Sequence, residues 1–257
     1  MYDNVCKYLI ETFPEDFTTW LIGEAIPVVQ LQPKELRNDP IRADSLILHG
    51  QNIIIHTEFQ THPDPNIPLR MADYYLRIRK QFTQHRIHQV VIYLRESGSP
   101  LVTQSTFESD GMHHQFRVIR LWEQPLDQFL NAPGLLPFAV LSQTDRQDPE
   151  TLLRDIKQRL DSLSDREQQG NLTTATAMLA TLKLDKDLVK QIMRSQAMRE
   201  SPFYQDILEE GRQEGRQEGI RWLLIKIVPV LQRGGFPVEG ILALSGLTLA
   251  DLDLEDK

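Results

Sequence analysis

Residues 42–60 contain two β-type segments separated by three residues, and this pair restricts the possible folds of the chain most. The segment 42–49 ends in SLILH, and the segment 53–60 begins with three consecutive isoleucines, a composition typical of a buried strand. Gly50-Gln51-Asn52 lies between them and indicates a tight turn. We therefore expect two neighbouring strands joined as a hairpin.

The length of the hairpin loop decides which side chains face each other. With a three-residue loop, His49 pairs with Ile53, and Asp44 then lies directly opposite Glu58. With a two-residue loop, Asp44 lies opposite Thr57 instead. Only the first of these two registers brings both carboxylates together.

Asp44, Glu58 and Gln60 form the candidate site at this hairpin. Glu58 and Gln60 are two residues apart on one strand, so their side chains point to the same face. Opposed carboxylates repel each other unless a cation, a proton or a basic group lies between them. Mg²⁺ or Mn²⁺ suits such oxygen ligands and can activate water for phosphodiester hydrolysis. The alternative is a solvated polar face of an edge hairpin.

Helical and strand-like spacing alternate along the first half of the chain, which predicts an α/β fold. Beyond Pro125 the pattern is helical, so we place a boundary near residue 124, with a core over 1–124 and a helical region over 125–257. The last helix is expected to kink or end near Pro229. The other expected elements are two short helices over 3–23, a helix over 67–84, strands over 89–94 and 115–122, and helices over 152–163, 172–198 and 204–231.

The composition is that of an ordinary globular protein, with 257 residues, 40% hydrophobic and 25% charged. Cys6 is the single cysteine, which excludes an internal disulfide and zinc sites that need paired cysteines. A reducing, cytoplasmic setting fits this usage. Charges interrupt every apolar run near the N-terminus, and no stretch reaches membrane-spanning length, so we expect no signal peptide and no membrane partner.

A basic segment follows the candidate site in an otherwise acidic chain. The net charge of -8, from 28 Lys and Arg against 36 Asp and Glu, disfavours tight non-specific binding to a polyanion. Between residues 66 and 95, however, Asp73 is the single acidic residue. The basic residues there are Arg70, Arg77, Arg79, Lys80, Arg86 and Arg95. We interpret the first four as a surface that contacts DNA phosphates; an ordinary solvated helix face is the alternative.

The run PIRADSLIL followed by IIIHTEFQ resembles the signature of the PD-(D/E)XK nuclease superfamily, in which an Asp precedes a Glu-x-Lys on the next strand. The matching residues are Asp44, Glu58 and Gln60. Within that superfamily the chain is similar to the recombination-promoting nuclease and putative transposase branch, where a glutamine commonly takes the lysine position. The resemblance covers about residues 1–124.

Three further matches to this branch lie in the first helix, in the helix after the hairpin and near the C-terminus. They are Asp3, Cys6 and Lys7, with cysteine in place of the usual aromatic residue; Arg70 and Tyr74; and the GRQE repeat between Gly211 and Gly219. The resemblance implies a restriction-endonuclease-like αβββαβ core and a metal-dependent DNA endonuclease related to recombination or transposition. Asp44 and Glu58 are then metal ligands, and Asp3, Lys7 and Tyr74 are accessory residues.

Gln60 departs from the superfamily pattern. A lysine places positive charge beside the attacking water, whereas an amide only orients it by hydrogen bonds, so transition-state stabilisation is weaker. The alternative function is therefore a catalytically weak or inactive nuclease-fold protein that acts as a DNA-binding or self-associating module.

The repeat GRQEGRQEG gives the helix over 204–231 an unusual pattern. Gly211, Gly215 and Gly219 form one row, and each costs about 1 kcal/mol relative to alanine in a helix. Glutamates form a second row and arginines a third, so neighbours within each row repel. Packing against another helix with complementary charges would relieve both costs, which indicates a homo-oligomer formed through the C-terminal helices. A solvated low-complexity helix is the alternative.

His56, His113 and His114 could suggest a metal site, but we assign them none. His56 lies on the same strand face as Glu58, but the HTE triplet lacks the downstream cysteines of a zinc deaminase. His113 and His114 are adjacent in a polar stretch, and we interpret them as solvated.

Overall fold

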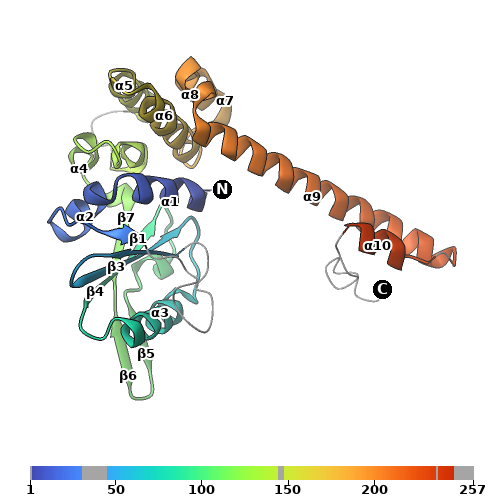
Figure 1. The fold of residues 1–257 in the computed structure, drawn as a ribbon, viewed down its shortest axis with the longest axis horizontal. Coiled ribbons are helices and arrows are strands. Elements are labelled where there is room, and N and C mark those ends of the chain that lie inside the picture. Colours follow the sequence, from blue (N-terminus) through green and yellow to red (C-terminus); the bar gives the residue numbers. More distant parts are fainter. Residues whose placement is uncertain (1, 31–44, 144–147, 236, 246–257) are drawn as a thin grey trace. The chain divides into compact units, whose positions relative to one another are not determined.

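Strand β3 (Ile53–Gln60) lies at the centre of a five-stranded sheet with the order β1-β2-β3-β4-β7. β1 (Val29–Gln30), β2 (Ser45–His49) and β3 pair antiparallel, whereas β3, β4 (Arg86–Tyr93) and β7 (Arg117–Arg120) pair parallel. The computed structural model describes residues 2–30, 45–143, 148–235 and 237–245 (Figure 1). The fold is therefore mixed α/β, as the sequence predicts.

The register of the β2–β3 hairpin differs from the one expected. His49 lies opposite Ile54, and Ser45 lies opposite Glu58. The reason is that Gly50 belongs to the ladder, because its N–H donates to the carbonyl of Ile53 at 2.9 Å, and only Gln51 and Asn52 form the turn. Glycine is required there, since a Cβ on Gly50 would lie 2.9 Å from the Ile53 side chain.

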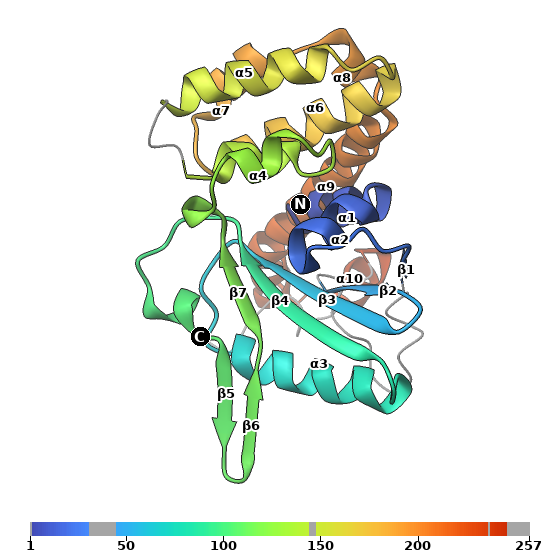
Figure 2. The ribbon, with the colours of Figure 1, turned by 90° about the vertical axis from the view of Figure 1, so that its left-hand side faces the viewer.

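Helix α3 (Ile67–Gln81) connects the parallel strands β3 and β4 and covers one face of the sheet (Figure 2). Ile54 of β3 packs there against Tyr74 and Ile78 of the helix. Helices α1 (Tyr2–Thr12) and α2 (Pro14–Ile22) lie on the other side of the sheet. On that face the ring of Phe59 stacks on Phe138 with centroids 6.0 Å apart. Even-numbered β3 residues therefore face α3.

Between β4 and β7 the chain forms a two-stranded hairpin that sequence spacing did not predict. After the short helix η2 (Pro100–Thr103), β5 (Thr106–Ser109) pairs antiparallel with β6 (Met112–Gln115), and Gly111 turns the chain with φ 76°. The strand expected over 115–122 is present in shorter form as β7 and is followed by the short helix η3 (Leu121–Glu123), whereas the polar stretch before it contains β6 rather than a loop.

The helices between residues 124 and 201 belong to the same compact unit as the sheet. The first compact unit is Met1–Ser201 and the second is Pro202–Lys257, so the boundary expected near 124 lies inside the first unit. Tyr2 and Thr181 share a hydrogen bond of 3.0 Å, and the rings of Trp20 and Phe129 lie 5.4 Å apart. The elements of this part are α4 (Asp127–Leu130), η4 (Leu136–Leu141), α5 (Pro149–Asp161), α6 (Arg166–Ala180), α7 (Lys186–Met193) and α8 (Gln196–Glu200).

The single helix expected over 172–198 is divided into α6, α7 and α8, because polar side chains start new helices within it. Asp185 accepts hydrogen bonds from the N–H groups of Asp187 and Leu188, and Ser195 accepts one from Met198. These are N-caps, which satisfy backbone donors that a helix start leaves open.

The second unit contains the long helix α9 (Pro202–Arg233) and the short helix α10 (Glu239–Ser245). Pro229 lies inside α9, which continues to Arg233 rather than ending at the proline. Leu224 and Val228 of α9 pack against Val238 and Leu242. Among the helices that the structure describes, none combines the length and the apolar character that crossing a bilayer requires.

Candidate functional site

Glu58 is fully buried in β3, on the face that α3 covers, and its carboxylate forms an ion pair with Arg70. The Nη2 atom of Arg70 contacts Oε1 of Glu58, and the Arg70 side chain is only 15% exposed. An ionised carboxylate buried in this way is strongly unfavourable unless a cation is near it. Arg70 supplies that charge from the first turn of α3.

Asp64 positions Arg70 by shaping the start of α3. Its Oδ1 accepts a hydrogen bond from the backbone N–H of Asn66 at 2.9 Å, a turn that leads the chain into the helix. Its Oδ2 accepts from Nη1 of Arg70 at 3.1 Å. The guanidinium therefore bridges one buried and one partly exposed carboxylate, Glu58 and Asp64.

Gln60 ends β3 and also contacts Glu58. Its Nε2 donates to Oε1 of Glu58 at 3.2 Å, so the two side chains share one face, as their spacing predicts. The second oxygen of Glu58, Oε2, is buried and accepts no hydrogen bond from any residue that the structure describes. A bound cation would provide the partner that this buried oxygen lacks.

A hydrogen-bonded chain of three side chains, His56, Gln89 and His114, lies buried beneath α3. Gln89 donates from Nε2 to Nδ1 of His56 and to the Met71 carbonyl, each at 2.9 Å, and its Oε1 accepts from Nε2 of His114 at 2.7 Å. Because Nδ1 of His56 accepts, the proton of neutral His56 lies on Nε2. This network brings together β3, β4, β6 and α3.

The histidines of this network are neutral around pH 7. Burial lowers the pKa of His56 to about 3, and the charges of Arg70 and His114 add to the effect. Burial also lowers the pKa of His114, and its neighbour His113 contributes. The interpretation of both adjacent histidines as solvated is therefore wrong for His114, which is 9% exposed. His113 is exposed and lies 3.3 Å from Glu108.

The sequence did not predict that Gln89 and His114 are hydrogen-bonded to each other. Gln89 carries a weak signal, a polar residue beside the apolar run VVIYL of a buried strand. His114 carries none, because its burial depends on the β5–β6 hairpin folding back toward α3.

The basic residues expected to contact phosphate have partners on or near α3. Besides Arg70, Arg77 lies 2.7 Å from Asp73 on the same helix. Arg79 donates to the carbonyls of Thr83 at 2.9 Å and His85 at 2.8 Å, which stabilises the turn into β4. Lys80 is exposed. The contact of these residues with DNA stays a prediction.

The accessory residues expected from the resemblance occupy different parts of the fold. Tyr74 is buried on α3, and its ring meets that of His56 edge-on at 5.3 Å. Lys7 lies 3.8 Å from Glu11 on α1, and the charge of Asp3 adds to the burial that raises the pKa of the Cys6 thiol. Tyr74 thus borders the network next to Glu58, whereas Asp3 and Lys7 act within α1.

Asp44 lies outside the described residues. Among those described, no group of three or more His, Cys, Asp or Glu side chains is placed to hold a metal ion. Glu58 and Gln60 are the part of the expected metal site that the structure describes. Oε2 of Glu58 has no hydrogen-bond partner among the described residues, and the amide of Gln60 lies beside this carboxylate. These atoms fit a cation, while Arg70 already offsets part of the charge.

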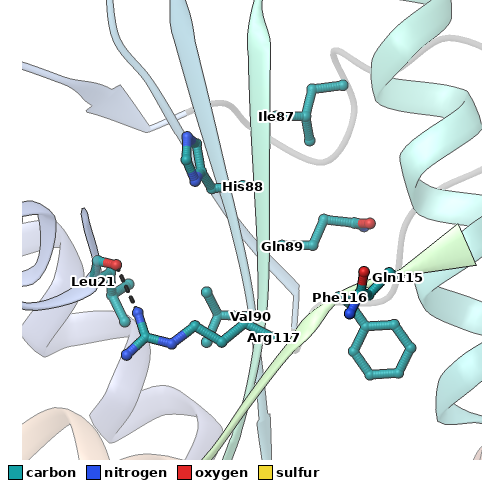
Figure 3. A pocket seen from close by; sticks show the side chains of 8 residues that line it. All are labelled: Leu21, Ile87, His88, Gln89, Val90, Gln115, Phe116 and Arg117. Carbon is teal, nitrogen blue, oxygen red and sulfur yellow. Dashed lines mark hydrogen bonds between the residues drawn. The ribbon is translucent and has the colours of Figure 1, made fainter. Parts of the chain in front are cut away.

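A hollow of about 440 Å³ lies at the edge of β4, where β7 begins to pair with it (Figure 3). Gln89 and Phe116 line it on one side of the strand, and His88 and Arg117 on the other. Arg117 donates to the Leu21 carbonyl at 2.8 Å. The β4 part of this hollow pairs with residues 54–57 of β3, so the hollow is offset along the sheet from Glu58 and Gln60.

The chain matches no protein-family model, no curated protein and no solved structure.

Proposed function

We propose that the chain is a metal-dependent endonuclease that hydrolyses phosphodiester bonds in DNA, in a process related to recombination or transposition. The observation that carries the proposal is the buried Oε2 of Glu58, which has no hydrogen-bond partner among the described residues. The order of α2, β1, β2, β3, α3 and β4 also supports a restriction-endonuclease-like αβββαβ core.

In this proposal Glu58 and Asp44 hold Mg²⁺ or Mn²⁺, which when bound supplies Lewis-acid stabilisation of the phosphoryl group. Gln60 orients the attacking water through its amide, which already contacts Glu58 at 3.2 Å. Arg70 supplies a positive charge beside the buried Glu58 carboxylate and holds that side chain in place. The exposed Lys80 and the neighbouring Arg77 contact the DNA backbone.

The test is nicking of supercoiled plasmid by the full-length protein with Mg²⁺ or Mn²⁺. We expect Asp44→Ala and Glu58→Gln to reduce nicking at least about 100-fold, the usual scale for losing a group that stabilises the transition state. Asp187→Asn is the matched control, because Asp187 is an exposed carboxylate on α7, outside the proposed metal and DNA contacts. Equal nicking by the wild type, Asp44→Ala and Glu58→Gln would overturn the proposal.

The ion pair between Arg70 and Glu58 favours a second candidate, a nuclease-fold module that binds DNA or itself without catalysis. Here Arg70 takes the place of a metal as the counter-charge of Glu58. Calorimetry separates the two candidates: the nuclease binds Mn²⁺ in a manner that Glu58→Gln abolishes. The module binds no Mn²⁺, and its affinity for DNA falls with salt equally in the wild type and in Glu58→Gln.

A further inference from the structure

One side of α9 is open along the GRQE repeat. A Cβ built on Gly211, Gly215 or Gly219 meets no atom within 4 Å. Successive residues of a helix are 100° apart, so Leu224 lies half a turn away from Gly215 and Val228 half a turn away from Gly219. These two residues pack against α10. The short helix therefore covers the side of α9 opposite the glycines.

Large apolar side chains continue the glycine row toward the end of α9. Trp222 follows Gly219 by three residues and is 64% exposed, and Leu223 follows it by four and is 48% exposed. Val230, 57% exposed, follows Leu223 by seven residues, about two turns of helix, and therefore lies on the same side. An exposed apolar surface of this kind indicates an interaction site.

Charges of opposite sign flank the glycine row. A glutamate precedes Gly211 and Gly219, and an arginine follows Gly211 and Gly215. Because neighbours in sequence are 100° apart on a helix, the glutamates lie on one flank of the row and the arginines on the other. Arg212, Arg216 and Glu218 are exposed. The helix thus carries both halves of a complementary charge pattern.

We propose that α9 pairs with α9 of a second copy of this chain, side by side and parallel, through the row from Gly211 to Val230. In a parallel two-fold pair, the left flank of one helix faces the right flank of the other, so glutamates meet arginines. In an antiparallel pair like flanks meet, and glutamates face glutamates. The glycines allow close approach of the two backbones, and Trp222 is covered.

Cross-linking tests the orientation independently of any nuclease activity. Cys6 is fully buried, so the wild type is expected to form no intermolecular disulfide. In a parallel pair, position 211 of one chain lies beside position 211 of the other. The Gly211→Cys variant therefore forms a disulfide-linked dimer under mild oxidation. Trp222→Cys does the same. A disulfide that forms only when Gly211→Cys is mixed with Gly219→Cys would show an antiparallel pair and overturn the proposal.

The oligomeric state tests the surface itself. By sedimentation or light scattering we expect a dimer for the wild type and at least tenfold weaker association for Gly215→Leu, because the added side chain keeps the two helix backbones apart. Leucine is a better helix former than glycine, so circular dichroism should show α9 intact. Gln217→Leu places the same leucine side chain on the helix away from the glycine row and should leave the dimer unchanged. A monomeric wild type at about 100 µM would refute the interface.

Discussion

At the scale of single residues, Gln60 places a neutral amide beside Glu58, so Arg70 is the positive charge that the structure places on this carboxylate. The amide of Gln60 contacts Oε1 of Glu58 and carries no net charge. The signature of the superfamily that the chain resembles has a lysine at this position. A single donor that stabilises developing negative charge contributes about 10²–10³ in rate to an acyl-transfer enzyme. The identity of one side chain therefore sets the expected rate at this site.

We predict that Gln60→Lys raises the rate of plasmid nicking by about tenfold or more, because its ammonium adds positive charge where the phosphate would react. The rate is measured with Mn²⁺ at saturating protein. Gln60→Met, similar in length but uncharged, should give no gain. An unchanged rate in Gln60→Lys would argue against a phosphate bound near this position.

His56 makes the stability of the first unit depend on pH. Its folded pKa of about 3 lies below the ordinary value of 6.5, so the unfolded chain binds the proton more readily. The stabilisation is fully present above pH 6.5 and is lost as the pH falls toward 3. Each bound proton changes the free energy of unfolding by about 1.4 kcal/mol per pH unit in that range.

We predict that His56→Asn reduces the slope of the unfolding free energy against pH between pH 6.5 and 4.5. The reduction is about 1.4 kcal/mol per pH unit, the effect of one proton. Asparagine removes the titrating ring and keeps an acceptor near Nδ1 for the amide of Gln89. Urea unfolding at several pH values measures the slope. His62→Asn is the control, because it makes the same change at an exposed histidine outside the His56, Gln89 and His114 network and should leave the slope as in the wild type. A wild-type slope in His56→Asn would show that His56 binds its proton equally well in the folded and the unfolded chain.

At the scale of elements, the sequence predicted what depends on local period and missed what depends on tertiary placement. The bounds of β3 and the shared face of Glu58 and Gln60 follow from β-branched composition and alternation. The predicted register of the β2–β3 hairpin was wrong by one residue. Residue composition does not show that Gly50 donates a hydrogen bond to Ile53 and so belongs to the ladder. The contact of Arg70 with Glu58 needs α3 docked on the sheet, which no spacing reveals.

The packing of α6 on α8 depends on one glycine. A Cβ on Gly170 would lie 2.3 Å from the carbonyl oxygen of Ala197 and 3.1 Å from Cβ of Ser201. Alanine favours a helix over glycine by about 1 kcal/mol, but here the obstacle is backbone, which cannot rotate away. The steric effect therefore exceeds the gain in helix propensity.

We predict that Gly170→Ala lowers the free energy of unfolding by about 1–3 kcal/mol, as overpacking of a close contact does. Gly98→Ala is the control, since a Cβ at Gly98 meets no atom within 4 Å and should change stability by less than about 0.5 kcal/mol. Urea unfolding of the full-length protein gives both values. Equal stability of the two variants would show that α6 and α8 separate without cost.

At the scale of the whole molecule, the two units differ in how much apolar surface each buries. The first contains a five-stranded sheet covered by helices on both faces. The core of the second consists of Leu224, Val228, Val238 and Leu242 among the described residues, with a few partly buried neighbours. A unit of about this size with so small a core is marginally stable alone. Association through the open side of α9 would stabilise it by mass action.

We therefore predict that amide hydrogen exchange in α9 slows as protein concentration rises from about 1 to 100 µM, whereas exchange in β3 and β4 stays constant. With dimerisation, a hundredfold rise in concentration adds up to about 2.7 kcal/mol of apparent stability to the associating unit. Mass spectrometry of peptides from both units measures this directly. Gly215→Leu should remove the concentration dependence in α9 and leave β3 and β4 as in the wild type. If α9 exchanges at one rate across this range, its stability comes from contacts within one chain, and the exposed row from Gly211 to Val230 contributes nothing to it.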